Sequence, residues 1–442
     1  MSLIERIFHL KERGTTVGRE VRGGAATFLT MAYILVANPA ILSAAGVPTG
    51  AAIAGTAAAA AVASLLMGVF ANVPIALAPG MGLNAIIAFQ IAPQLGSWQA
   101  AMGLVVLDGL VVLLFVLVGV REAVLNAVPR DLRRAIGVGI GLFIAFIGLV
   151  NARIVVVPGG TVAGLTANPT AVLPPVTFGS LATPEAITAL VGVTIVAALL
   201  ARNVNGAILL GIAASTAVAV ALGITGPPPA VVSQPDFSTL FQADISSALT
   251  LVAMPLLASI IMVDFFDTMG TASAIAEEAG IVDENENIPR MRTLLAMDAV
   301  GASIGGLFGV SSATSYIESA AGVAEGARTG LHSVVVAILF ALALFIAPLL
   351  GIVPASATAP ALIVVGFLMC QQIGRIDFRT IDTALPAFVL LVTIPFTYSI
   401  SHGIGYGFIT YVAIKFLTLR ARDVHPLMLV TAIAFAAYFV YA

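Results

Sequence analysis

Charged side chains are scarce in this chain of 442 residues, in which Asp, Glu, Lys and Arg together make up only 9%. A soluble domain carries about 25% charged residues, so a soluble enzyme of this size and a disordered chain are both excluded. The single cysteine, Cys370, cannot close an internal disulfide and therefore says nothing about the redox compartment. The net charge of −3 gives no support to nucleic-acid binding, which needs a clustered basic face.

Hydrophobic residues are abundant instead, at 60% of the chain and a mean hydropathy of +1.09. They gather in long runs such as residues 100–120, interrupted only by Asp108, and residues 333–352. As a helix, each run is long enough to cross about 30 Å of hydrocarbon. Residues 1–22 form a charged amphipathic lead without the apolar core and cleavage site of a signal peptide. The sequence therefore predicts an all-α polytopic membrane protein whose first span is retained.

Charged, proline and glycine breaks divide the apolar runs into about fourteen predicted spans. With a cytoplasmic N-terminus, every one of the 19 Lys and Arg except Arg153 falls on the inside, as the positive-inside rule expects. A last apolar run at 426–441 either lies in the interface or replaces a neighbouring span. The predicted spans are residues 23–44, 50–71, 79–93, 100–120, 134–151, 185–201, 205–223, 245–272, 291–309, 314–323, 329–352, 357–371, 383–400 and 403–419.

Two of these spans are interrupted by helix-breaking or small polar residues, the third at 78–82 and the tenth at 311–315. Irregular backbone at membrane depth is tolerated only where it is buried in protein or lines a cavity. Both breaks are therefore expected to point inward.

The two breaks occupy matching places in the two halves of the chain. GVF at 68–70 precedes the first break and GLF at 306–308 the second, an offset of 306 − 68 = 238 residues. AAG at 44–46 matches EAG at 278–280 with an offset of 280 − 46 = 234. These offsets predict two repeats, 23–225 and 236–442, and seven spans in each make the repeats inverted. Inverted repeats with broken helices in corresponding positions indicate a secondary transporter with a midplane site.

Five carboxylates lie within predicted spans, where an Asp at a helix centre costs about 2.5–3.5 kcal/mol. Asp264 and Asp267 are three residues apart and share one helix face, with no Lys or Arg within twenty residues. Their repulsion in apolar surroundings favours a proton on at least one of them, so the pair is a candidate proton carrier. The alternative is that both brace neighbouring helices. We expect structural roles for Asp108 and Asp298.

Glu318 follows the break in the tenth span, at the first turn of a half-helix where free N–H groups stabilise a carboxylate. Asn84 is its polar counterpart after the first break. A carboxylate and an amide together could match the edge of a flat heterocycle that carries adjacent N–H and C=O groups. Purely structural roles remain open for both residues. His332, near a span end, is predicted to be interfacial.

Four stretches of the chain resemble the signature motifs of the AzgA-like purine permeases, a branch of the nucleobase/ascorbate transporters. The resemblance covers nearly the whole chain, and the motifs are specific in combination. One departure is Met269, where related sequences often carry a smaller residue, which leaves the preferred purine open. The stretches are FLTMAY at 28–33, APGMGLNA at 78–85, DFFDTMGT at 264–271 and YIESAAG at 316–322.

The resemblance implies fourteen spans in two inverted repeats, with short strands before the half-helices of spans 3 and 10. It implies a core domain (23–120 and 245–352) and a gate domain (134–223 and 357–442). It also implies proton-coupled import of hypoxanthine, guanine or adenine across the cytoplasmic membrane. Asp267 matches the residue tied to proton coupling. Asn84, Asp264 and Glu318 match substrate-contacting residues, to which we add Thr30, Thr268 and Ser319 as predicted substrate contacts.

Two other functions share features with this sequence. Sulfate and bicarbonate exchangers share this architecture, but an acidic site without a buried Arg or Lys opposes an anionic substrate. A membrane-embedded aspartyl enzyme would place its two Asp residues on facing helices, whereas Asp264 and Asp267 lie on one helix. The sequence therefore predicts a transporter that needs no cofactor or metal other than the coupling proton. Its expected partners are the purine and the lipid bilayer, and a homodimer remains open.

Overall fold

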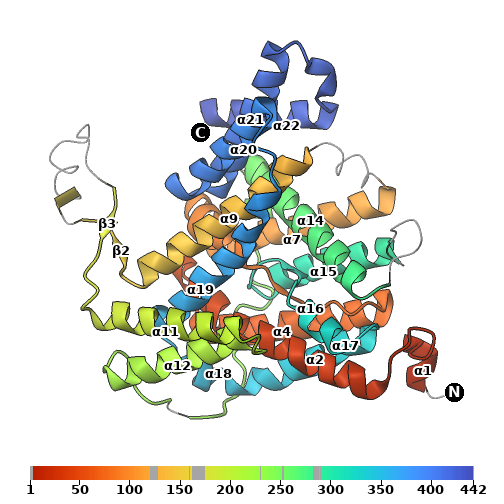
Figure 1. Cartoon of the computed structure of the whole chain (residues 1–442), viewed down its shortest axis with the longest axis vertical. Helices are drawn as coiled ribbons and strands as arrows, with labels where there is room; N and C mark the ends of the chain where they lie inside the picture. Colours follow the sequence, from red (N-terminus) through yellow and green to blue (C-terminus); the bar gives the residue numbers. More distant parts are fainter. Residues whose placement is uncertain are drawn as a thin grey trace.

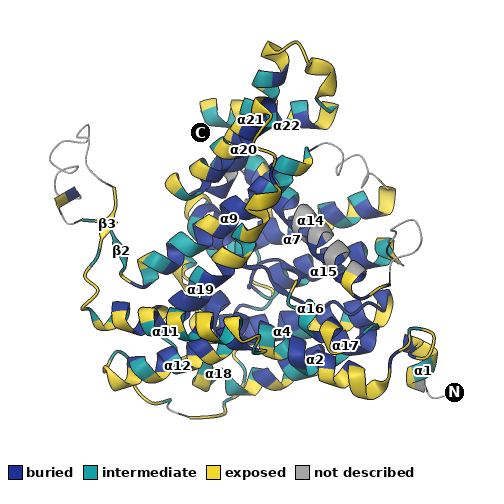
Figure 2. Ribbon diagram, in the orientation of Figure 1, coloured by how far each residue is buried: buried dark blue, intermediate teal, exposed yellow. Residues whose placement is uncertain are grey.

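The long apolar runs form helices that pack side by side around a buried centre (Figure 1). The computed structural model describes residues 3–119, 128–158, 160–161, 175–228, 230–250, 253–281, 288 and 290–441. For residues 3, 265–267, 269, 270, 273, 274, 277, 401 and 441 only the backbone is described. Figure 2 shows buried positions concentrated in the middle of the molecule and exposed positions along outer helices.

The first half of the chain begins with the short amphipathic helix α1 and continues through helices that match predicted spans 1–7. Residues 67–71 continue α4 as π-helix, and residues 87–91 are wound as π-helix between α5 and α6. The helices are α1 (Leu3–Phe8), α2 (Val17–Met31), α3 (Ile34–Leu42), α4 (Thr49–Leu66), α5 (Met81–Ile86), α6 (Ala92–Leu95), α7 (Trp98–Val118), α9 (Arg130–Asn151), α11 (Pro184–Ala201) and α12 (Ala207–Ala221), and the strands are β1 (Leu77–Pro79), β2 (Val155–Val156) and β3 (Thr177–Phe178).

The second half contains helices that match predicted spans 8–14, and the last apolar run forms the separate helix α22. Seven helical runs among the described residues are long and apolar enough to cross a membrane, and five shorter apolar helices accompany them. The elements are α13 (Ile245–Ala248), α14 (Ala253–Glu278), α15 (Met291–Leu307), β4 (Ala313–Ser315), α16 (Ser319–Ala324), α17 (Gly330–Ala343), α18 (Ala347–Leu350), α19 (Ala355–Cys370), α20 (Ile381–Phe396), α21 (Ile400–Leu417) and α22 (Pro426–Tyr441).

Strands β1 and β4 pair antiparallel at the two predicted breaks, with Leu77 opposite Ser315 and Pro79 opposite Ala313. The pairing extends beyond the strands. The N–H of Gly80, just after β1, donates to the carbonyl of Ser312, just before β4, at 2.9 Å. Every residue of both strands is buried, so these bonds satisfy backbone groups that have no access to water. The strands begin 313 − 77 = 236 residues apart, which agrees with the predicted repeat offset. The expected short strands are thus confirmed.

The helices pack in two sets around the paired strands β1 and β4, which together are called the strand crossing. In one set α7 lies against α15, and α17 lies against α2 and α4. In the other, α19 packs on α9, α11 and α12, and α20 packs on α9 and α21. Contacts between the sets include α5 with α9 and α12 with α2. The crossing itself lies against α4, α14 and α15.

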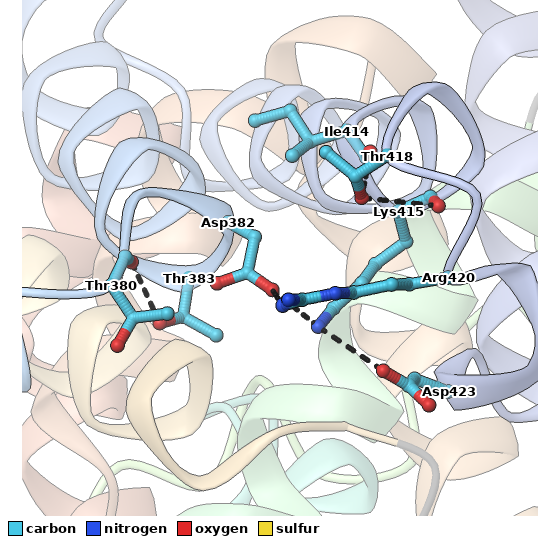
Figure 3. A network of polar contacts seen from close by, with 8 residues as sticks. All are labelled: Thr380, Asp382, Thr383, Ile414, Lys415, Thr418, Arg420 and Asp423. Atoms are coloured by element: carbon cyan, nitrogen blue, oxygen red, sulfur yellow. Dashed lines mark hydrogen bonds and ion pairs between the residues drawn. The ribbon is translucent and has the colours of Figure 1, made fainter.

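A buried ion pair joins the start of α20 to the end of α21 (Figure 3). The Lys415 ammonium group donates to Asp382 at 2.5 Å, and only 9% and 6% of these side chains are exposed. Arg420 lies 3.4 Å from the same Asp382 oxygen, and Asp423 lies 3.6 Å from Lys415. Lys415 was predicted only as one of the basic residues on the inner side, and its burial was not anticipated.

Candidate functional site

Asn84 is fully buried on α5, the half-helix that begins directly after β1. Neither its amide nitrogen nor its amide oxygen is hydrogen-bonded to any residue in the described part of the chain. A buried polar group left without a partner costs about 1–3 kcal/mol, so such groups in native proteins usually have a ligand or water as a partner. The sequence pattern anticipated a polar contact at this position, and the structure leaves the amide available for one.

Asp264 lies on α14 with 1% of its surface exposed. The Ser312 hydroxyl, just before β4, donates to its Oδ1 atom at 3.2 Å. Asp264 is thereby held at the edge of the strand crossing. Asp267 lies one helical turn further along α14, and its side chain is outside the described residues.

Thr268 and Asp298 tie α14 and α15 to β4. The Thr268 hydroxyl donates to Asp298 Oδ2 at 2.6 Å and lies 2.9 Å from the Thr314 hydroxyl. The Ser315 hydroxyl donates to the other Asp298 oxygen at 2.7 Å. Both carboxylate oxygens of Asp298 are therefore engaged in fixing the strand, as its predicted structural role requires. Thr268, expected as a substrate contact, is 2% exposed and belongs to this network.

Glu318 occupies the N-cap position of the other half-helix, α16, without a capping hydrogen bond from its side chain, and is half-buried. The Tyr33 hydroxyl donates to its Oε1 atom at 2.7 Å, which orients the carboxylate from the first broken helix. The Thr30 hydroxyl donates to Glu318's backbone oxygen at 3.4 Å but also to its own helix, at Thr27 O (2.8 Å). The Ser319 hydroxyl accepts the Ala76 N–H at 3.0 Å. Thr30 and Ser319 thus support the site's backbone in this structure.

The predicted residues come together around one structural element. Asp264 is bonded to the chain next to β4, Glu318 follows β4 by three residues, and Asn84 follows β1. Helix α14 packs against α5, β4 and α16, so all three side chains belong to elements that meet at the crossing. The arrangement offers carboxylate acceptors and an amide, without an Lys or Arg bonded to them among the described residues. No described group of His, Cys, Asp and Glu could hold a metal ion.

His332 is not interfacial, contrary to the sequence prediction. Its side chain is fully buried, and its Nε2 atom lies 2.8 Å from the Thr27 hydroxyl. The prediction failed because His332 belongs to the first turn of α17, which packs inward on α2. Glu20 was missed altogether: it is buried and accepts the Arg328 and His332 N–H groups at 2.8 and 3.1 Å, which caps α17. Its place in the charged lead gave no sign of burial.

This arrangement of paired strands and two half-helices, within seven-plus-seven inverted repeats, defines a class of membrane transporters. The same fold occurs in the transmembrane domain of a cyanobacterial bicarbonate transporter, BicA. That domain matches with a TM-score of 0.65 and 17% identity, over 88% of this chain and 97% of that one. The murine Slc26a9 anion transporter in its inward-facing state matches with a TM-score of 0.66 and 12% identity, over 90% of this chain and 68% of that one.

The chain belongs to the permease family of nucleobase/ascorbate transporters, whose profile matches residues 18–405. The adenine permease AdeP of Escherichia coli is 39% identical over 440 residues, which cover 98% of this chain and 95% of AdeP. The guanine/hypoxanthine permease PbuG of Bacillus subtilis is 38% identical over 455 residues, which cover 99% of this chain and 100% of PbuG. The nucleobase transporter PlAzg2 of Paenibacillus larvae is 31% identical over 89% of this chain and 76% of its own. The predicted family and the assignment to transporters rather than enzymes are confirmed, and the protein is an integral membrane protein.

Proposed function

We propose that this protein imports purine nucleobases (adenine, guanine or hypoxanthine) across the cell membrane together with protons. The observation that carries the proposal is the fully buried Asn84 amide, left without a partner among the described residues, at a crossing that also holds Asp264 and Glu318. The full-length relatives named as adenine and guanine/hypoxanthine permeases support the same substrate class.

The chemistry of the site suits an uncharged purine. Its ring N–H and C=O groups lose water on entering a buried site and need replacement partners. Asp264 and Glu318 accept N–H groups, while the Asn84 amide both donates and accepts. An anion would meet two carboxylates and no described cation, which disfavours sulfate or bicarbonate.

Proton coupling is assigned to Asp267, on the same helix face as Asp264. A proton on Asp267 lowers the repulsion between the two carboxylates and makes substrate binding more favourable. The two sets of packed helices support a core domain (23–120 and 245–352) that rocks against a gate domain (134–223 and 357–442). The excess of Lys and Arg in the predicted inner loops supports a cytoplasmic N-terminus.

The test is uptake of labelled purines into vesicles that contain the purified protein, with and without an imposed pH gradient. We expect saturable uptake, competition by unlabelled neutral purines and faster accumulation when the outside is acidic. Competition by sulfate or bicarbonate but not by purines would overturn the proposal.

Glu318→Gln should reduce high-affinity purine uptake by about 100-fold, because a charge-assisted hydrogen bond of about 3 kcal/mol is lost. The matched control is Glu325→Gln, an exposed carboxylate on the residue that follows α16. Normal uptake by Glu318→Gln would leave Glu318 with a structural role only.

Asp267→Asn should retain purine binding but lose accumulation driven by a pH gradient, because an amide cannot release a proton. Purine binding is measured by equilibrium titration. Proton coupling is measured by comparing counterflow of purine, which needs no pH gradient, with uptake driven by a pH gradient. If accumulation by Asp267→Asn responds to pH as the natural protein does, Asp267 has no part in coupling.

A further inference from the structure

A small cavity lies where the N-terminal segment of the chain meets the start of α15. Its volume is about 250 Å³, and it is lined by His9, Glu12, Arg13, Asn72 and Arg290. Sites for drug-sized ligands occupy about 300–1,000 Å³, so this cavity suits a small polar group rather than a whole nucleotide. None of its lining residues belongs to the strand crossing, so the cavity is separate from the candidate transport site.

Helix α1 and the turn after it are fixed to the rest of the protein next to the start of α17 (Figure 1). Phe8, Leu10 and Leu331 form one small buried cluster. The Asn72 amide donates to the Phe8 carbonyl at 3.2 Å and accepts the Gly330 N–H at 2.8 Å. The wall that the N-terminal segment gives to the cavity therefore has a defined place on the molecule.

The two arginines of the cavity have no carboxylate partner among the described residues. Arg13 and Arg290 form no ion pair there, and Glu12 lies 3.4 Å from the His9 ring instead. The Nη1 atom of Arg13 is buried without a hydrogen bond to any described residue. The nearby Arg292, by contrast, donates to a backbone carbonyl of α7 at 2.6 Å. A buried cationic donor without an acceptor is unfavourable, and an anion would remove this cost.

The position of Arg290 is electrostatically unfavourable as well. It is the N-cap residue of α15 and has a φ of 55°, in the left-handed region. The N-terminus of a helix carries a positive partial charge, which repels a cation. Burial lowers the pKa of Arg13, and the charge of Arg290 acts on it in the same direction. An anion in the cavity would relieve both repulsions, and helix N-termini are common anion sites.

We propose that this cavity binds a phosphate monoester group between Arg13 and Arg290. Such a group carries a charge of about −1.5 to −2 at pH 7, which matches two guanidinium groups. The planar fork of an arginine donates two parallel hydrogen bonds to phosphate oxygens. Soluble phosphates on the side of the membrane where the N-terminus lies and the headgroup of phosphatidic acid both carry this group. The bound group joins the N-terminal segment to α15, and it does so independently of the function proposed above.

The first test is the unfolding temperature of the full-length protein in neutral detergent, titrated with inorganic phosphate at constant ionic strength. It should rise in the natural protein and in Arg202→Gln, an exposed control at the end of α11. Arg13→Gln and Arg290→Gln should each weaken phosphate binding by about 10- to 100-fold, because charge-assisted hydrogen bonds are lost. An equal rise in all four proteins overturns the proposal.

The second test identifies the source of the group by repeating the measurement in lipid nanodiscs without added phosphate. If a headgroup occupies the site, phosphatidic acid should raise the unfolding temperature more than phosphatidylglycerol, an anionic phosphodiester, and Arg13→Gln should abolish the difference. A response to inorganic phosphate alone assigns the site to a soluble compound. A natural protein that responds to neither probe has no such site, and the proposal falls.

Arg290→Gly separates phosphate binding from a structural role of the arginine. Glycine adopts a φ of 55° without strain and removes the positive charge from the start of α15. Without phosphate this variant should therefore unfold at a higher temperature than the natural protein, and phosphate should no longer raise that temperature. A lower unfolding temperature without phosphate, or a full response to phosphate, contradicts the proposal. This result decides the matter even if Arg13→Gln does not fold.

Discussion

Hydrogen bonds from hydroxyl groups orient two carboxylates of the candidate site. The Tyr33 hydroxyl bonds to Glu318 from α2's continuation, and Ser312 bonds to Asp264 from β4's edge. The first bond joins the two repeats, because Tyr33 belongs to the first repeat and Glu318 to the second, whereas Ser312 and Asp264 both belong to the second. At the scale of residues, the site is therefore built by contacts between the repeats and within one of them.

Tyr33→Phe should raise the KM for purine uptake about tenfold, because it removes a hydrogen bond to a carboxylate worth about 1.5 kcal/mol. Uptake kinetics over a substrate series measure the change. Tyr406→Phe, an exposed tyrosine on α21, should leave KM unaltered. Equal KM values for the natural protein and Tyr33→Phe would show that the bond does not orient Glu318 for binding.

Lys415→Met should lower the stability by about 3 kcal/mol, since it leaves Asp382 buried without its closest cation. Arg420 remains near Asp382, so the loss of stability is expected at the low end of the range of about 3–5 kcal/mol for a broken buried ion pair. Thermal unfolding in detergent ranks the variants by stability, and Arg422→Met, at an exposed position in the loop after α21, is the control. The double variant Lys415→Met/Asp382→Leu should recover much of the loss, and a double variant less stable than Lys415→Met would contradict this view.

Helices and strands differ in how readily the sequence predicts them. Hydropathy predicted the long helices, because a helix that crosses a membrane requires a long continuous apolar run. Strands β1 and β4 have three residues each and carry no periodicity. The helix breakers predicted only irregular backbone there, and the strands followed from the family resemblance alone. The burial of His332, Glu20 and Lys415 was missed since it depends on which helices pack together, a tertiary property.

The strand crossing depends on a close approach by α15. A Cβ atom on Gly305 would lie 1.9 Å from the Ser311 carbonyl oxygen, where backbone must shift. We expect Gly305→Ala to cost about 1–3 kcal/mol by overpacking, measured as a lower unfolding temperature and lower uptake. Gly137→Ala on α9 has no atom within 4 Å of the new methyl group and should be neutral or slightly stabilising. Equal behaviour of the two variants would argue against a tight crossing.

At the scale of the whole molecule, the prediction of inverted repeats agrees with the fold, while the division into core and gate domains stays a prediction. The repeats could be predicted because matching tripeptides and paired breaks leave a trace in sequence. The sequence does not establish the division into core and gate domains in this way, because that division rests on how the two parts move between two conformations. One contact between the two sets of helices, Gly82 with Ile140, gives a direct test.

A disulfide between Gly82→Cys on α5 and Ile140→Cys on α9, in a Cys370→Ala background, should block purine uptake until it is reduced. A Cβ atom on Gly82 would lie 2.9 Å from Ile140 Cγ2, so the two positions face each other where α5 meets α9. The control pair, Gly68→Cys and Val334→Cys, lies within the predicted core at a similar 3.0 Å. Full uptake by the oxidised Gly82/Ile140 pair would mean that these two surfaces do not move during transport.

The pairing of β1 with β4 also constrains how the protein is made. During synthesis β1 is complete 234 residues before β4 begins (313 − 79 = 234), so its backbone N–H and C=O groups must wait for a distant partner. Exposed strand edges are not tolerated in hydrocarbon. The nascent first repeat therefore has to be sheltered, by water or by the insertion machinery, until the second repeat arrives, and neither repeat is expected to mature alone.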